Sequence, residues 1–131
     1  MRKLAGWIVA AGALAVLAAP GARAATEADF AAKTTGDLVA LCNPAGDTAM
    51  DNAGINFCAG FFQGAVLVEQ QHEANPRARK FFCLPDPRPT RDEVMKGFVG
   101  WANASPDRLQ MSAVDGVMTY LGATYPCGKK R

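Results

Sequence analysis

The fold is decided by residues 57–70, FCAGFFQGAVLVEQ, a largely apolar run that carries one cysteine and two glycines. The run predicts the middle of a helix, where each glycine costs about 0.8–1 kcal/mol relative to alanine. Gly60 and Gly64 lie four residues apart, so they share a helix face on which another backbone can approach closely. Phe61 and Phe62 add bulk beside that face. We expect a helix crossing at these glycines, within the monomer or across a dimer; a ligand groove is the alternative.

The first 24 residues have the features of a secretory signal peptide. Two basic residues precede an apolar run over residues 4–19, and Ala22-Arg23-Ala24 supplies a small-x-small cleavage site. The run is short for a membrane span, which needs about 20 residues. An uncleaved anchor is the alternative. Cleavage after Ala24 leaves residues 25–131 as one small exported domain, periplasmic and without a membrane segment.

The charge of the mature chain is close to balanced. Removal of residues 1–24 takes away three of the 14 basic residues and none of the 12 acidic ones. A net charge near zero gives no reason to expect nucleic acid or an anionic membrane surface as a partner.

Four cysteines in a small exported chain indicate two disulfides, because oxidising compartments form such bonds and a small core benefits from them. The spacings contain no C-x-x-C, so a metal site is not expected. Cys42 closes one predicted helix and Cys58 lies in the next, whereas Cys83 precedes a helix and Cys127 follows one. Helical hairpins would therefore pair Cys42 with Cys58 and Cys83 with Cys127. The pairing of Cys42 with Cys127 and Cys58 with Cys83 stays open.

Capping signals and apolar stripes predict an all-α fold of four helices, arranged as a pair of helical hairpins. Thr34 with Asp37 opens a short helix that Asn43-Pro44 ends, and Thr48 opens the longest helix, which runs to about residue 74. Thr90 with Glu93 is a capping box for the third helix. The fourth is expected to start at Ser105-Pro106-Asp107 and to end at Tyr125-Pro126-Cys127.

No catalytic constellation emerges from the sequence. The single histidine, His72, is 14 residues from Cys58, or about 21 Å along a continuous helix, which excludes a Cys-His nucleophile pair. The adjacent acids Asp92 and Glu93 are better explained by the first turn of a helix. No phosphate loop, haem motif or metal-spaced histidine cluster is present. We therefore expect a binding protein with no cofactor, and not an enzyme.

Two polar features are candidates for recognition. Gln63 and Gln70 are seven residues apart and share a helix face, and residues 77–80 form a basic cluster that contains Arg77 and Arg79. Solvated surface is the simplest interpretation of both features, and contact with a partner is the alternative.

The order of these motifs resembles the Rap/Tai immunity proteins of type VI secretion systems. The resemblance spans about residues 35–127 and is carried by Cys58-x-Gly60-Phe61-x-x-Gly64, Gln70, Phe82-Cys83-Leu84-Pro85, Ser105-Pro106-Asp107-Arg108-Leu109, Ala113 and Tyr125-Pro126-Cys127.

This resemblance implies a helical periplasmic protein with two disulfides, often self-associating, that neutralises a peptidoglycan-cleaving effector such as an amidase. Inhibition would be stoichiometric occlusion of the effector. The cysteines and the two glycines carry over as scaffold residues. Gln70, Arg77 and Arg79, around the loop of residues 75–80, are the candidate effector contacts. A small envelope-stress chaperone is the alternative function.

Overall fold

The computed structural model describes residues 22–128 of the 131-residue chain. Most of the predicted signal peptide therefore lies outside the described residues. Within residues 22–128 the chain forms one 3-10 helix and five α-helices, and no strand. The helices are η1 (Glu27–Ala31), α1 (Thr35–Cys42), α2 (Ala49–Glu73), α3 (Arg91–Asn103), α4 (Pro106–Gln110) and α5 (Ala113–Thr124). The prediction of an all-α fold is confirmed.

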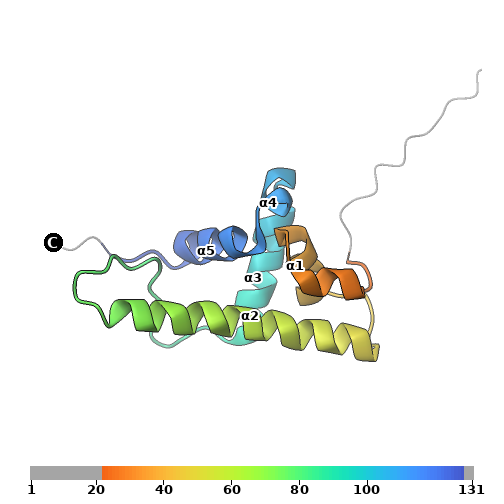
Figure 1. Ribbon diagram of the computed structural model, residues 1–131, viewed down its shortest axis with the longest axis horizontal. Coiled ribbons are helices and arrows are strands. Elements are labelled where there is room, and N and C mark those ends of the chain that lie inside the picture. The colour runs from red at the N-terminus through yellow and green to blue at the C-terminus, as the bar shows by residue number, and fades with distance from the viewer. Residues whose placement is uncertain (1–21, 129–131) are drawn as a thin grey trace, which may run out of the picture.

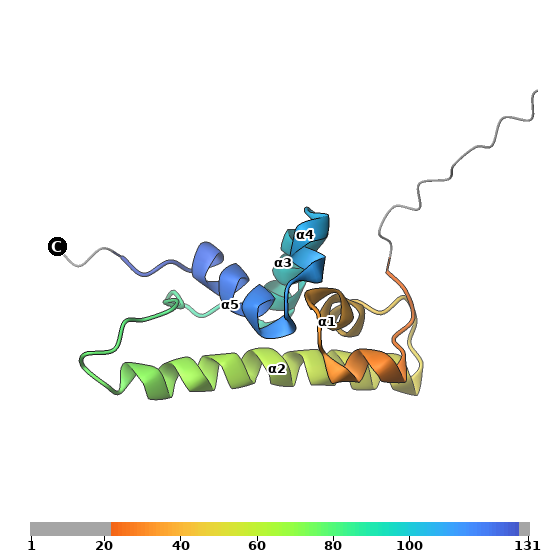
Figure 2. The same cartoon turned by 45° about the horizontal axis from the view of Figure 1, so that its top comes forward.

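Helix α2 runs along one side of the molecule for most of its length, and the other helices pack against its opposite side (Figures 1 and 2). Its N-terminal half lies beside η1 and α1, and α5 lies over its C-terminal half (Figure 1). None of the helices within residues 22–128 is both long enough and apolar enough to span a membrane.

The predicted capping signals form as expected at the starts of α1, α2 and α3. At Thr34, the hydroxyl accepts the N–H of Asp37 at 3.1 Å, and the Thr34 N–H donates to the Asp37 carboxylate at 2.9 Å. At α3, the Thr90 N–H donates to Glu93 Oε2 at 2.7 Å and the Thr90 hydroxyl donates at 2.8 Å. These bonds lower the pKa of Glu93. Each reciprocal pair satisfies N–H groups that the first helical turn leaves without a partner.

The predicted fourth helix is divided into α4 and α5, whereas the sequence predicted one continuous helix. Met111 adopts an extended conformation between them, and Ser112 caps α5 by accepting the Asp115 N–H at 3.1 Å. The break frees the Met111 carbonyl to accept the Thr35 N–H at 2.8 Å. Residues 112–115 therefore carry a Ser-x-x-Asp capping signal, which starts α5. The break before α5 leaves the Met111 carbonyl free to bind the first turn of α1.

The core lies where α2, α3 and α5 meet around three aromatic rings. Phe98 is fully buried, and its ring centroid lies 5.2 Å from that of Phe62 and 5.7 Å from that of Tyr120, in edge-to-face contacts. Burial raises the pKa of Tyr120 to about 12. Truncating a buried aromatic side chain of this kind typically costs about 3–5 kcal/mol.

Both preferred disulfides are present, so the alternative pairing is wrong. Cys42 bonds to Cys58 with a Cα–Cα distance of 5.2 Å, and Cys83 bonds to Cys127 with a Cα–Cα distance of 4.9 Å. The first bond joins α1 to the middle of α2. The second ties the loop before α3 to the end of α5.

Three glycines permit close approaches between helices, and they differ from the predicted pair, Gly60 and Gly64. A Cβ at Gly116 would overlap the side chain of the buried Thr35, and a Cβ at Gly97 would overlap the hydroxyl of Tyr120. A Cβ at Gly54 would lie 3.3 Å from Leu41. These positions, on α5, α3 and α2, set the spacing between neighbouring helices.

Candidate functional site

The C-terminal half of α2 forms one wall of an apolar cavity of about 120 Å³. The opposite wall comes from the loop before α3 and from α3 itself. Its polar lining residues are Gln63, Arg88 and Arg91, so the cavity combines apolar walls with two positive charges. The remaining lining residues are Ala59, Phe62, Val66, Leu84, Pro89, Val94, Met95 and Leu121.

A second, polar cavity of about 160 Å³ adjoins the first and shares Val66, Leu84 and Arg88 with it. Its lining contains two acidic and two basic side chains, and Lys80 pairs with Glu73 at 3.2 Å. The other lining residues are Glu69, Gln70, Phe82 and Cys83. We refer to the two cavities together as the α2 groove.

The loop that forms the far wall of the α2 groove is fixed at two points. The Cys83 N–H donates to the Tyr125 carbonyl at 2.8 Å, next to the disulfide between Cys83 and Cys127. The Phe81 N–H donates to Glu69 Oε1 at 2.9 Å. The groove is thus a preformed feature, because a covalent bond and two hydrogen bonds hold its loop in place.

Glu69 is the one buried carboxylate in the α2 groove, with 3% of its surface exposed. Oxygen Oε1 is satisfied by Phe81, but Oε2 is buried without a hydrogen-bond partner among the described residues. A buried carboxylate oxygen that lacks a donor costs stability. Glu69 is therefore bonded within the described residues through only one of its two carboxylate oxygens.

Gly60 and Gly64 lie on a different, open face of α2. Apart from the neighbouring backbone of α2 itself, no heavy atom of the described residues lies within 4 Å of a Cβ built at either position. The expected crossing within the monomer is therefore wrong, because this face of α2 points away from the other helices. Phe62 instead packs in the core and Phe61 is partly buried. A crossing with a second copy stays a prediction.

The two residues weighed above as a nucleophile pair, Cys58 and His72, have structural roles. Cys58 is bonded to Cys42 and has no free thiol. His72 Nε2 lies 2.8 Å from the Arg79 carbonyl oxygen, and its ring stacks on Phe81 with centroids 4.8 Å apart. Within residues 22–128, no group of three or more His, Cys, Asp or Glu side chains is arranged to hold a metal ion.

The chain matches a known protein family. A family model described as the Rap1a immunity proteins matches residues 34–127. The chain belongs to this family. The matched range covers α1 to α5 and both disulfides of this Rap1a protein. Membership implies an immunity protein directed against a secreted effector. No curated protein and no solved structure gave a match.

The Rap1a fold brings only some of the predicted contact residues to the α2 groove. Gln70 lines the polar cavity, and Gln63 lines the apolar one. Arg77 and Arg79 are exposed and line neither cavity. Their loop is closed locally, since the Arg77 N–H donates to the Asn75 side chain at 3.0 Å. A role for these two arginines in binding stays a prediction.

Arg88 lines both cavities of the Rap1a protein and was not among the residues predicted from the sequence. It lies in the proline-rich loop after Cys83, which the sequence marks only as an irregular segment. A basic residue among prolines gives no local signal of a cavity. The position of Arg88 in the groove follows only from the packing of that loop against α2.

Proposed function

We propose that this Rap1a protein is exported to the periplasm and neutralises a peptidoglycan-degrading effector, of the amidase type, by binding it stoichiometrically. The observation that carries the proposal is the family match over residues 34–127. All four cysteines are paired, which supports export to an oxidising compartment. Inhibition requires only binding, because an effector whose active site is covered cannot reach the cell wall.

The α2 groove is the surface that we assign to the effector. Its apolar cavity can receive a bulky apolar side chain, and Arg88 and Arg91 line the same cavity with no acidic residue among its lining. The chemistry therefore fits an effector loop in which an apolar side chain stands next to a carboxylate. Arg-carboxylate bonds at such a site give specificity, and a buried apolar anchor supplies much of the affinity.

The test of function is protection of cells. A cell-wall hydrolase encoded by a neighbouring gene is expressed and directed to the periplasm, where it stops growth. Co-expression of the full chain should restore growth. A chain that lacks residues 1–24 should leave the cells unprotected, because effector and inhibitor then occupy different compartments. Lysis in the presence of the exported chain would contradict the proposal. Protection against acid-induced aggregation of unrelated proteins, without any effect on the hydrolase, would instead indicate a chaperone.

The assignment to the α2 groove is tested by two charge reversals at exposed arginines. Arg88→Glu alters a residue that lines both cavities, whereas Arg77→Glu alters a residue of the basic loop outside them. We expect Arg88→Glu to weaken effector binding about tenfold or more, which corresponds to about 1.4 kcal/mol. Arg77→Glu serves as the matched control. The reverse result would move the contact to the loop of residues 75–80.

A further inference from the structure

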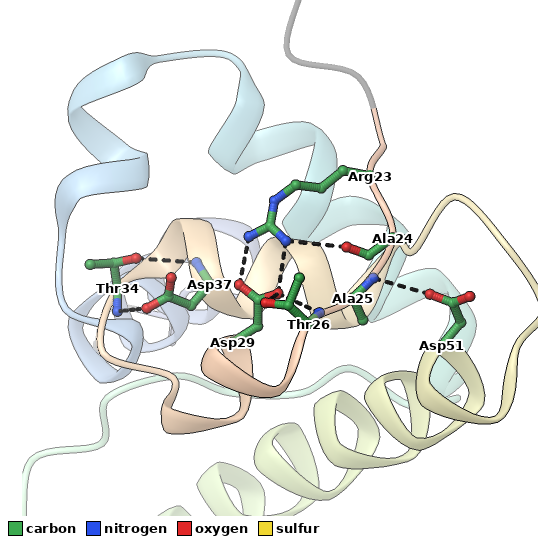
Figure 3. A network of polar contacts seen from close by, with 8 residues as sticks. All are labelled: Arg23, Ala24, Ala25, Thr26, Asp29, Thr34, Asp37 and Asp51. Atoms are coloured by element: carbon green, nitrogen blue, oxygen red, sulfur yellow. Dashed lines mark hydrogen bonds and ion pairs between the residues drawn. The ribbon is translucent and has the colours of Figure 1, made fainter.

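The backbone nitrogen of Ala25 is buried against a carboxylate from the start of α2. Its N–H donates to Asp51 Oδ1 at 3.1 Å (Figure 3). Ala25 is 8% exposed and Asp51 is 1% exposed, although Ala24, one residue earlier, is exposed. Ala25 is thus a buried position between two exposed neighbours, Ala24 and Thr26.

Asp51 is a buried carboxylate that receives only neutral donors. Oxygen Oδ2 accepts the Thr48 N–H at 3.1 Å and the Thr48 hydroxyl at 2.7 Å, and Oδ1 accepts the Ala25 N–H. The Thr48 hydroxyl, and then the Ala25 N–H, hold the pKa of Asp51 below its usual value, so the group is ionised. No ion pair to Asp51 is present among residues 22–128. A buried charge is costly unless it is both paired and hydrogen-bonded, and Asp51 has hydrogen bonds but no countercharge among these residues.

The predicted cleavage site would supply that countercharge. Ala22-Arg23-Ala24 marks the bond after Ala24 for a signal peptidase. Hydrolysis of that bond adds the hydroxyl of water to the Ala24 carbonyl carbon, which leaves with the leader as a carboxylate. The nitrogen of Ala25 takes the remaining hydrogen and a proton from solvent, and so becomes an α-ammonium.

We propose that Ala25 is the mature N-terminus and that its α-ammonium forms a buried ion pair with Asp51, so that removal of the leader completes the fold. The inference rests on the proposed export, but it concerns processing and not effector binding. The peptide N–H of Ala25 already occupies the required position in the uncleaved chain. Cleavage changes the charge of a nitrogen that already lies 3.1 Å from the Asp51 carboxylate.

Cleavage also removes the ion pair between Arg23 and Asp29. The Arg23 guanidinium donates to Asp29 Oδ2 at 2.7 Å and to Oδ1 at 2.5 Å (Figure 3). The Arg23 carbonyl accepts the Ala45 N–H at 3.1 Å. After cleavage, Asp29 keeps the N–H and the hydroxyl of Thr26, at 2.8 and 2.7 Å. Cleavage therefore removes a positive charge beside Asp29 and creates one beside Asp51. Because both carboxylates can accept the new α-ammonium, a test has to distinguish Asp51 from Asp29.

The first measurement is the intact mass of the protein exported with its own leader, which should correspond to a chain beginning at Ala25. A different N-terminus would overturn the inference. The second uses two oxidised chains released from a removable fusion partner, one beginning at Ala25 and the other at Ala24. Both lack Arg23, and they differ in whether the nitrogen of Ala25 is an ammonium or a peptide N–H.

We expect the chain that begins at Ala25 to melt several degrees higher than the chain that begins at Ala24. Asp51→Asn should remove this difference, and Asp29→Asn should preserve it. Equal melting temperatures in the unsubstituted pair, or a difference that survives Asp51→Asn, would overturn the ion pair. A difference that only Asp29→Asn removes would assign the ammonium to Asp29.

A labelling experiment keeps the inference testable if Asp51→Asn does not fold. The α-amine of the chain beginning at Ala25 should react several-fold more slowly with an amine-reactive reagent than that of the chain beginning at Ala24, as read by mass spectrometry of the N-terminal peptide. Equal rates would contradict burial of the terminus. Neither readout involves the effector. If the ion pair is absent, the proposed function is unaffected, and if the chain inhibits no effector, the ion pair is unaffected.

Discussion

The side chain of Thr35 occupies the space that a Cβ atom on residue 116 would need. Thr35 is fully buried at the start of α1, its N–H donates to the Met111 carbonyl at 2.8 Å, and its hydroxyl donates to the Ser112 carbonyl at 3.2 Å. The N-terminal turn of α1 is thereby held against the start of α5. Glycine at position 116 is what allows this contact.

Gly116→Ala is expected to lower the free energy of unfolding by about 1–3 kcal/mol, because the new methyl group overpacks a buried contact. Gly97→Ala should behave similarly, since its Cβ would meet the Tyr120 hydroxyl. Gly100→Ala is the matched control on the same helix as Gly97, where nothing lies within 4 Å. Urea denaturation measures the free energy of unfolding of each variant. Equal stability of all three variants would show that the close approaches are absent in solution.

Gly60→Ala and Gly64→Ala should each raise the free energy of unfolding, by up to about 0.8–1 kcal/mol. Both glycines lie in a helix interior, and among the described residues a methyl group there would contact no atom beyond the neighbouring backbone of α2. The measurement is again urea denaturation, over a range of protein concentrations. A loss of stability that appears only at high concentration would show that a second copy covers this face, as the dimer prediction requires.

Removing the bond between Cys83 and Cys127 as a double alanine variant should cost about 4 kcal/mol, and removing that between Cys42 and Cys58 about 3 kcal/mol. The order follows from the sequence separations, which are 44 and 16 residues. Loss of the first bond should also loosen the loop of the α2 groove and weaken effector binding. A variant without it that binds normally would argue against a preformed groove.

The raised pKa of Tyr120 predicts a loss of stability at high pH. Burial raises this pKa to about 12, against about 10 in an unfolded chain. The folded state therefore holds the phenol proton more tightly. The stabilising contribution is complete below pH of about 10 and is lost as the pH rises through about 12. Tyrosinate absorbance, compared with that of Tyr120→Phe, measures the titration. A Tyr120 that ionises near its ordinary pKa would contradict the packing of this ring.

Local signals in the sequence predicted most of the helix starts and both disulfides. A Thr-x-x-Asp or Thr-x-x-Glu box acts within four residues, so Thr34, Thr48 and Thr90 could be interpreted without tertiary information. The cysteine pairing followed because Cys42 and Cys58 flank a short connection between two consecutive helices.

The errors concern features that depend on distant residues. The role of a glycine is set by what faces it, and only the fold shows that Gly116 meets Thr35 whereas Gly64 meets nothing. At the break, the Met111 carbonyl accepts a hydrogen bond from Thr35, which lies far earlier in the chain. Arg88 lines the α2 groove because its loop is tied to the segment after α5 by a disulfide and to α2 by the hydrogen bond from Phe81 to Glu69. No local pattern encodes that position.

The most direct measurement of the central claim is the residual peptidoglycan hydrolysis by the purified effector as the oxidised chain is added. Stoichiometric occlusion predicts a linear fall in activity that reaches zero near one mole of inhibitor for each mole of effector, with both proteins recovered intact. Full hydrolysis in the presence of a molar excess of the chain would contradict the account.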